Sequence, residues 1–312
     1  MIEVAEIRKT YNGHRALEGF SLKVSEGELF GLVGPNGAGK TTLIKILATL
    51  LAPSSGTARV AGMDVQHNRN AVKKLVGYLP DQPGLYQDMR LREFLQFFAD
   101  AFHLTKEQQP AAIENALTRA GLADRGDSFV EELSFGMKQR LVLAKTLLHS
   151  PKVLLLDEPA TGLDPIARLD LRRQLKQLNA EGITILISSH ILADLEDICT
   201  RVALISGGKN AADAEGNQVI QLAHFTTATR VYEIELLGLA APAAQIASRA
   251  MPGVTILKAE GNNLALELSG GNEEAAALLR HLVSSGIDIV RFDPHAASLE
   301  ERYQKAFGGP QP

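Results

Sequence analysis

The chain has 312 residues, of which 45% are apolar and 22% charged, a profile typical of globular proteins with one large domain or two ordinary ones. With a net charge of −4, no Trp and only 5% aromatic residues, it lacks the basic surface and the stacking groups of nucleic-acid binders, so we expect no nucleic-acid partner. The single cysteine, Cys199, excludes an internal disulfide and fits a reducing compartment.

The opening segment MIEVAEIRKT is charged and has no apolar core, so we expect no signal peptide. No apolar run reaches the roughly 18–20 residues that a membrane span needs. The richest candidate, LIKILATLLA, is interrupted by Lys45. If the protein works at a membrane, we expect it to act from the surface through a partner.

The first motif is a phosphate-binding loop. Leu29–Val33 is an apolar run of buried-strand length, and residues 34–41 fit G-x-x-x-x-G-K-[ST] before a helix predicted to start near Gly39. The glycines let backbone N–H groups point at a polyphosphate, and the helix dipole adds positive charge. We expect Lys40 to reach the β- and γ-phosphates and the Thr41 hydroxyl to hold Mg²⁺. A plain glycine-rich turn is the alternative, which the flanking strand and helix disfavour. The nucleotide-binding residues expected in this motif are Gly34, Pro35, Asn36, Gly37, Ala38, Gly39, Lys40, Thr41 and Thr42.

Residues 91–150 are predicted to form an inserted helical subdomain. Its helices are expected over Leu91–His103, Lys106–Ala120 and Met137–His149. The first helix carries a stripe of apolar side chains at helical spacing, which are Leu91, Phe94, Leu95, Phe98 and Phe102. Such a stripe is typical of a subdomain core, and this interpretation is favoured over a docking surface.

A second glycine-bearing turn opens the last of these helices. Leu133–Arg140 reads LSFGMKQR, in which Ser134 is a good N-cap and Gly136 leaves a backbone N–H uncovered. A hydroxyl and a bare N–H at a helix N-terminus form an anion-binding surface. An ordinary capped helix is the alternative. Because the chain already has one phosphate loop, the turn makes sense if it serves the nucleotide of another copy.

Two carboxylates follow a second buried strand. Val153–Leu156 is an apolar run that ends in Asp157 and Glu158, and open parallel sheets bind ligands at this end of their strands. We expect Asp157 to hold Mg²⁺ through water, and Glu158 to orient and polarise the attacking water. An acidic turn after a strand is common, so the two carboxylates indicate a nucleotide site only in combination with the phosphate loop. Residues 151–206 are predicted to alternate strand–helix–strand–helix–strand.

The rest of the chain changes composition. Residues 207–228 are predicted to be a linker, because Ser206–Gln218 is rich in Gly, Asn and small polar residues. Residues 229–312 are predicted to form a small α+β, ferredoxin-like accessory domain in the order β-α-β-β-α-β. Its segments are Val231–Leu237, Ala241–Ala250, Val254–Lys258, Leu264–Leu268, Glu273–Ser285 and Ile287–Phe292. A capping box of Ser298 and Glu301 predicts a terminal helix. Dimer support, regulation and stability alone are all compatible with this domain.

In this order the motifs resemble an ATP-binding cassette, the nucleotide-binding subunit of ABC transporters. The resemblance covers roughly Ile2–Ser206, with GPNGAGKTT matching the Walker A loop, LLLDEP Walker B and LSFGMKQR the signature, whose usual form is LSGGQ. It implies an α/β P-loop ABC ATPase core, with a mixed sheet, an antiparallel β subdomain and the inserted helical subdomain. Similar C-terminal extensions occur in exporter-type bacterial ABC systems, a much weaker match.

The resemblance also implies residue roles. Tyr11 matches the aromatic residue that stacks on adenine, and Asp164, in ATGLD, belongs to the D-loop that meets the other subunit. His190 matches the switch histidine, which joins Lys40 and Glu158 as a catalytic group. The family usually has Gln directly after Pro80. Here Asp81 comes first and Gln82 second, and of the two we favour Asp81 for the contact with Mg²⁺ or water.

For function, the resemblance implies ATP and Mg²⁺ as cofactors and a homodimer, or a heterodimer with a second cassette, around two ATP. It implies a membrane-spanning permease partner at the cytoplasmic face of the membrane, bound peripherally near Asp81 and Leu91–Phe102, and export more than import. The alternative is a soluble or signalling ABC ATPase. Soluble relatives carry two cassettes or a long coiled-coil insertion, whereas here Lys40 and Ser134 are 94 positions apart without sustained heptads.

Overall fold

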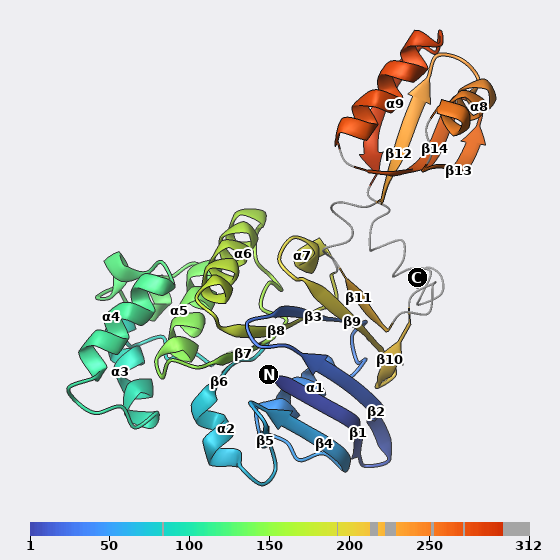
Figure 1. Cartoon of the computed structure of the whole chain (residues 1–312). Helices are drawn as coiled ribbons and strands as arrows, with labels where there is room; N and C mark the ends of the chain where they lie inside the picture. Colours follow the sequence, from blue (N-terminus) through green and yellow to red (C-terminus); the bar gives the residue numbers. More distant parts are fainter. Residues whose placement is uncertain are drawn as a thin grey trace. The chain divides into compact units, whose positions relative to one another are not determined.

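The computed structural model describes residues 1–82, 84–191, 193–212, 218–221, 229–250, 253–270 and 272–295. The chain divides into two units, one of Met1–Ala212 with Gly216–Ile220 and one of Asp213–Glu215 with Gln221–Pro312 (Figure 1). Within the described ranges no helix combines the length and the apolar character needed to cross a membrane. The predicted terminal helix at Ser298 lies outside the described residues.

A seven-stranded sheet forms the centre of the first unit. Its strand order is β10-β9-β3-β8-β7-β6, with β11 paired to β9. The neighbours from β9 to β6 are parallel, and β10 is antiparallel to β9. The strands are β3 (Leu29–Val33), β6 (Val76–Leu79), β7 (Val153–Asp157), β8 (Thr184–Ser189), β9 (Arg201–Ser206), β10 (Lys209–Ala211) and β11 (Val219–Gln221). Every residue of β3, β7 and β8 is buried, as expected for apolar runs inside a covered parallel sheet.

An antiparallel sheet packs beside the central one. Its order is β2-β1-β4-β5, from β1 (Ile2–Tyr11), β2 (His14–Val24), β4 (Ser55–Val60) and β5 (Met63–Asp64). Helices α1 (Lys40–Leu47) and α2 (Arg69–Leu75) belong to the same region. One apolar core joins the two sheets and α1, with Phe20, Phe30 and Ile44 fully buried in it. This shared core fixes the antiparallel sheet against the phosphate loop, which lies between β3 and α1.

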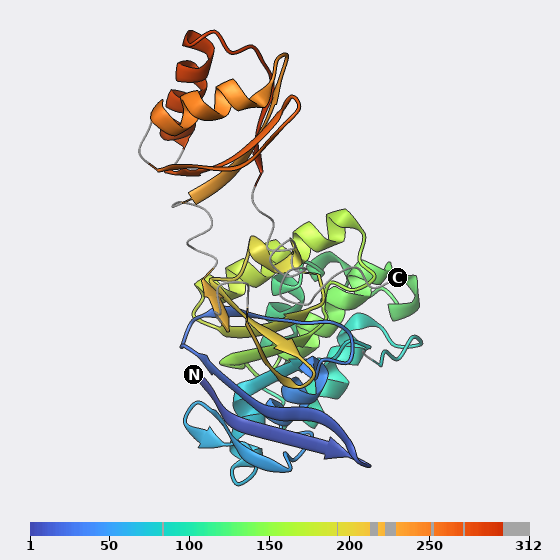
Figure 2. The same ribbon diagram turned by 90° about the vertical axis from the view of Figure 1, so that its right-hand side faces the viewer.

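The helical subdomain consists of α3 (Leu91–Ala101), α4 (Gln109–Arg119), α5 (Phe135–Leu147) and the short 3-10 turns η1 (Ala123–Arg125) and η2 (Val130–Glu132) (Figures 1 and 2). The apolar stripe on α3 is core as predicted at Leu91, Phe94 and Leu95, which are fully buried. Phe98 is partly buried, and Phe102 stays at the surface beside His149, with ring centroids 4.4 Å apart.

In the helical subdomain, two helix starts differ from the predictions. Helix α4 begins at Gln109 and not at Lys106, because Pro110 occupies its first turn, where its fixed φ and missing N–H are tolerated. Helix α5 begins at Phe135, two residues before the predicted Met137, because Ser134 is the N-cap and helical geometry starts directly after it.

The predicted linker is in part strand. Both β10 and β11 lie within residues 207–228, so the central sheet continues past Ser206. Gly207 and Gly208 have φ of +53° and +76°, and they turn the chain so that β10 pairs with β9. A short, polar edge strand after two glycines resembles a loop in sequence, which explains the error.

The second unit has the predicted ferredoxin-like order. Its elements are β12 (Thr229–Leu236), α8 (Ala240–Ala250), β13 (Val254–Glu260), β14 (Asn263–Ser269), α9 (Asn272–Ser284) and β15 (Ile289–His295). The sheet order is β13-β14-β12-β15 with all neighbours antiparallel, and both helices cover one face (Figure 2). Its apolar core contains Tyr232, Leu266 and Leu278.

Candidate nucleotide-binding site

The phosphate loop is pressed between strands of both sheets. Gly39 has φ of +109°, and a Cβ there would lie 2.5 Å from the carbonyl oxygen of Ala16 on β2. A Cβ on Gly34 would lie 2.2 Å from the carbonyl oxygen of Ile205 on β9. Helix α1 starts at Lys40 without a side-chain cap, so its first N–H groups are available to an anion.

Lys40 lies at the centre of the loop and is almost completely buried. Its ammonium donates to the carbonyl oxygens of Gly34 at 2.6 Å and Pro35 at 3.1 Å. The same nitrogen pairs with Oε1 of Glu158 at 3.0 Å. The positive charge is therefore held where the loop backbone and the end of β7 meet. Its contact with phosphates stays a prediction.

One carboxylate oxygen of Asp157 accepts two hydrogen bonds. The hydroxyls of Thr41 and Ser188 donate to Oδ1 of Asp157 at 3.1 and 2.9 Å. Burial raises the pKa of Asp157, and the negative charges of Glu158 and Asp81 raise it further. The hydrogen bonds from the Ser188 and Thr41 hydroxyls lower this pKa but do not outweigh burial. Among the described residues, Oδ2 of Asp157 is buried and has no hydrogen-bond partner.

This donor set fits a magnesium ion that is shared with a substrate. Mg²⁺ prefers one or two carboxylate oxygens together with hydroxyl, phosphate and water oxygens. Thr41 and the unpartnered Oδ2 of Asp157 supply such oxygens. The described part of the chain contains no group of three or more His, Cys, Asp or Glu side chains that could hold a metal ion alone. Thr41 and Asp157 would therefore supply part of the coordination of Mg²⁺, and phosphate and water oxygens would supply the rest.

Glu158 adopts a strained backbone conformation, with φ of +49°. Non-glycine residues rarely adopt this region, and such strain gathers at functional sites. Its N–H donates to the Ser188 hydroxyl at 3.1 Å, and Oε2 accepts from the His190 ring Nδ1 at 2.7 Å. Burial acts to raise the pKa of Glu158, but the His190 hydrogen bond and the Lys40 charge outweigh it and hold the pKa below its ordinary value. The carboxylate is thus ionised and fixed in direction.

The signature residues have other neighbours in the same chain. Ser134 accepts from the Met137 N–H at 3.3 Å, which is the predicted N-cap. A Cβ on Gly136 would lie 2.9 Å from Cβ of Ala167 on α6 (Pro165–Ala180), whose N-cap is Asp164. In the described part of the chain no hydrogen bond or ion pair joins Ser134 to the phosphate loop. The nucleotide contacts of Ser134, Gly136 and Asp164 stay predictions.

Three further residues predicted for the site are exposed. Tyr11 is 40% exposed at the end of β1, on the hairpin whose Ala16 contacts Gly39. Asp81 and Gln82 are exposed after β6. The negative charge of Asp81 acts on Asp157 and also on Tyr78, whose pKa rises to about 12, first through burial and then through these two carboxylates. Asp81 therefore lies close enough to the carboxylate cluster for its charge to be felt there.

Ser188 connects the cluster and was not among the residues predicted from the sequence. Its hydroxyl donates to Asp157 and accepts from the Glu158 N–H. The available signal was a hydroxyl residue near the carboxyl end of a buried strand. Its meaning depends on strand order, because Ser188 stands opposite Asp157 only once β8 pairs with β7 in parallel.

Comparisons with known proteins agree with this geometry. A family model described as ABC transporter matches residues 17–161. The uncharacterized ABC transporter ATP-binding protein YxlF of Bacillus subtilis (strain 168) is 33% identical over 308 residues, or 98% of this chain and 99% of that protein. Nod factor export ATP-binding protein I of Paraburkholderia xenovorans (strain LB400) is 38% identical over 219 residues, or 70% and 72%. A solved structure of an ATP binding subunit of an ABC transporter has 30% identity and a TM-score of 0.62, over 72% of this chain and 91% of that one. These matches confirm the resemblance, and the chain belongs to the ABC transporter family as an ATP-binding subunit that hydrolyses ATP.

Proposed function

We propose that two copies of this chain, or one copy and a related cassette, close head to tail around two ATP and use Mg²⁺-dependent hydrolysis to power export through a separate membrane subunit. The observation that carries the proposal is the cluster at Glu158. One strained, ionised carboxylate contacts Lys40 of the phosphate loop through one oxygen and His190 through the other.

Within this cluster, Glu158 orients and polarises the attacking water, and His190 holds the carboxylate in place. Lys40 pairs with Glu158 and faces the loop, so a γ-phosphate that attracts Lys40 weakens the pairing. Because the Lys40 charge lowers the pKa of Glu158, loss of the pair raises that pKa and makes Glu158 a better base. Such a positioned base supplies roughly 10²–10⁴-fold in rate. A magnesium ion held by Thr41 and Asp157 would neutralise charge on the phosphates.

The surface beside the signature turn supports a second copy as the partner. Phe135 is 58% exposed next to Ser134, and Ile166 and Leu169 on α6 are 73% and 49% exposed. A Cβ on Gly162 of the D-loop would lie 3.1 Å from the Phe135 ring, so the signature turn and the D-loop present one continuous face. We infer that this face, with the anion-binding N-terminus of α5, covers the ATP on the opposite phosphate loop.

A separate aromatic surface is proposed to bind the permease at the cytoplasmic face of the membrane. Tyr86 and Phe97 are 52% and 46% exposed, with ring centroids 5.5 Å apart. Tyr86 lies between β6 and α3 in the segment that also contains Asp81, and Phe97 contacts its ring, so we infer that a partner there can act on the nucleotide site. Apolar rings paired at a surface are typical of protein interfaces. Export is favoured because a relative is named for Nod factor export.

The test is a gentle-detergent purification of the Glu158→Gln variant from its own cells in the presence of ATP, with mass spectrometry of co-purifying proteins. A stoichiometric multi-span membrane protein is the expected result. Recovery of ribosomes or DNA-bound proteins, with no membrane protein, would contradict the proposed partner. ATP turnover by the same variant at the wild-type rate would instead contradict the role of Glu158.

A further inference from the structure

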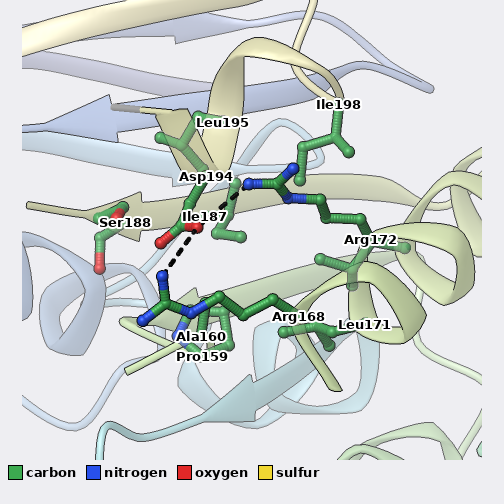
Figure 3. A pocket seen from close by; sticks show the side chains of 12 residues that line it. Pro159, Ala160, Arg168, Leu171, Arg172, Ile187, Ser188, Asp194, Leu195 and Ile198 are labelled. Carbon is green, nitrogen blue, oxygen red and sulfur yellow. Dashed lines mark hydrogen bonds and ion pairs between the residues drawn. The ribbon is translucent and has the colours of Figure 1, made fainter. Parts of the chain in front are cut away.

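We propose that Asp194, with Arg168 and Arg172, is a positioning cluster that sets His190 against Glu158. The inference rests on the proposed roles of Glu158 and His190 in hydrolysis. Asp194 belongs to the short helix α7 (Ala193–Glu196), four residues after His190, and both arginines project from α6 (Figure 3). The cluster therefore joins the segment after β8 to the helix that follows β7.

The carboxylate of this cluster is buried, whereas its two arginines are partly exposed. Asp194 is 6% exposed, and its Oδ1 lies 3.2 Å from Arg172 and 3.8 Å from Arg168. Arg172 also pairs with Asp197 at 3.0 Å, but the Asp197 side chain is 69% exposed. Burying a carboxylate is costly unless it is paired, so the two arginines fix where Asp194 can lie. Buried ion pairs contribute little net stability, and their best-attested use is to specify one geometry.

A short chain of contacts leads from Asp194 to His190. The Asp194 N–H donates to the carbonyl oxygen of Ile191 at 3.3 Å. The Ser189 hydroxyl accepts from the Ile191 N–H and donates to its carbonyl oxygen, both at 2.9 Å. The residues on both sides of His190 are thus tied to each other and to Asp194. Holding Asp194 holds the backbone from which the His190 ring reaches Oε2 of Glu158.

The other end of the cluster leads to the D-loop. Arg168 lies one turn after Asp164, the N-cap of α6, and its N–H donates to the Asp164 carbonyl oxygen at 3.0 Å. Between β7 and α6 the chain runs from Glu158 to Asp164, and this segment includes the D-loop. Helix α6 therefore connects a loop that starts at Glu158 with the cluster that fixes His190, and the two catalytic candidates share one support.

Buried apolar side chains also pack between these elements, and a small pocket remains beside them. A pocket lies among α6, β8 and α7, lined by both arginines, Asp194 and apolar side chains, which include Leu171, Leu175, Leu195 and Ile198 (Figure 3). Leu195 of α7 is fully buried, so apolar packing keeps α7 on the first unit, while the paired charges at Asp194 fix its direction at the edge of this pocket. Loss of the charge pairs should therefore let the His190 segment shift while the fold persists.

The test compares Asp194→Asn with Asp197→Asn in the full chain, measuring kcat, KM for ATP and thermal midpoint. Both variants remove a carboxylate from Arg172, but only Asp194 connects to Ile191. We expect Asp194→Asn to lower kcat by about 10- to 100-fold with KM for ATP unchanged, because a small misplacement of a catalytic group has effects of this size. Asp197→Asn should match the wild type. Equal kcat in wild type and Asp194→Asn would overturn the proposal.

A double variant separates positioning from general damage. If Asp194 acts through His190, adding Asp194→Asn to His190→Ala should lower kcat no further. If Asp194→Asn still lowers kcat by about 10- to 100-fold in the His190→Ala variant, the proposal is overturned. Should Asp194→Asn fail to fold, Arg168→Gln takes its place, since Arg168 is partly exposed and reaches the same carboxylate. Glu158→Gln is measured alongside: if it retains wild-type turnover, the proposed function fails, and if it is inactive while Asp194→Asn is normal, only this inference fails.

Discussion

The ring Nδ1 of His190 lies 2.7 Å from Oε2 of Glu158, although 32 positions separate the two residues in sequence. Both follow buried parallel strands, β7 and β8, which are neighbours in the sheet. The contact holds an ionised carboxylate at the strand ends, where open parallel sheets bind ligands. The same carboxylate reaches Lys40 through its other oxygen.

Replacing Glu158 by Gln should abolish ATP turnover while ATP binding remains. Gln keeps the shape of the side chain but cannot accept a proton from water, so an ATP-bound dimer should accumulate. Turnover by phosphate release and dimerisation by light scattering are the measurements. Glu26→Gln, at an exposed turn far along the chain from the motif, is the matched control and should behave as wild type. An inactive variant that never dimerises with ATP would contradict the proposed closure of two chains around ATP.

Acid should remove a stabilising contribution of Glu158. The folded pKa lies below the ordinary value of 4.5, because hydrogen bonding by His190 and the charge of Lys40 outweigh burial. A depressed pKa contributes stability that is present above the unfolded pKa and is lost as pH falls through the folded pKa. Below pH 4.5 the wild type should therefore lose free energy of unfolding relative to Glu158→Gln. Urea unfolding of both proteins across this pH window measures the difference in their free energies of unfolding. A difference that does not change with pH would contradict the pairing of Glu158 with His190 and Lys40.

Local motifs explain why much of the site could be predicted from sequence. The residues of the phosphate loop are contiguous, and Lys40, Thr41, Asp157 and Glu158 follow directly from short patterns next to buried strands. Ser188 could not be predicted, because its partner Asp157 is assigned only by the parallel pairing of β7 and β8. Periodicity and composition describe single segments, whereas this contact depends on which strands become neighbours.

The fold shows the same division. Long apolar runs and the order of the second unit were predictable, since each strand and helix there carries its own pattern. The strand β10 could not be predicted, because its residues Lys-Asn-Ala have no apolar alternation and pair only at the edge of the sheet. Asn210 instead bonds through its side chain to the backbone of Ser21 on β2, at 2.8 and 2.7 Å. That contact lies between residues 189 positions apart, beyond the reach of any local pattern.

The signature turn gives a test of the dimer that leaves the monomer intact. Gly136→Asp, a natural choice, also strains the monomer, because a Cβ there lies 2.9 Å from Cβ of Ala167. Ser134 is better suited: Asp and Asn both cap a helix about as well as Ser, so the bond to Met137 can be kept. Ser134→Asp places a negative charge where an opposing γ-phosphate is proposed to bind, and should prevent ATP-driven dimerisation. Ser134→Asn should dimerise, with both thermal midpoints close to wild type. Dimerisation of Ser134→Asp, seen by light scattering, would contradict the proposed contact.

The aromatic surface on the helical subdomain should be needed for the permease and not for ATP. Tyr86 and Phe97 lie at the surface, so their replacement by Ser costs little folding free energy, whereas their neighbour Phe94 is core and is left unchanged. We expect Tyr86→Ser/Phe97→Ser to bind ATP normally and to lose the co-purifying membrane protein. Leu50→Ser, at a residue that is 57% exposed on the first unit, controls for the loss of surface apolar area. Retention of the membrane protein by the double variant would move the permease contact away from this surface. Loss by the Leu50 variant as well would show that the association depends on apolar area in general and not on these two rings.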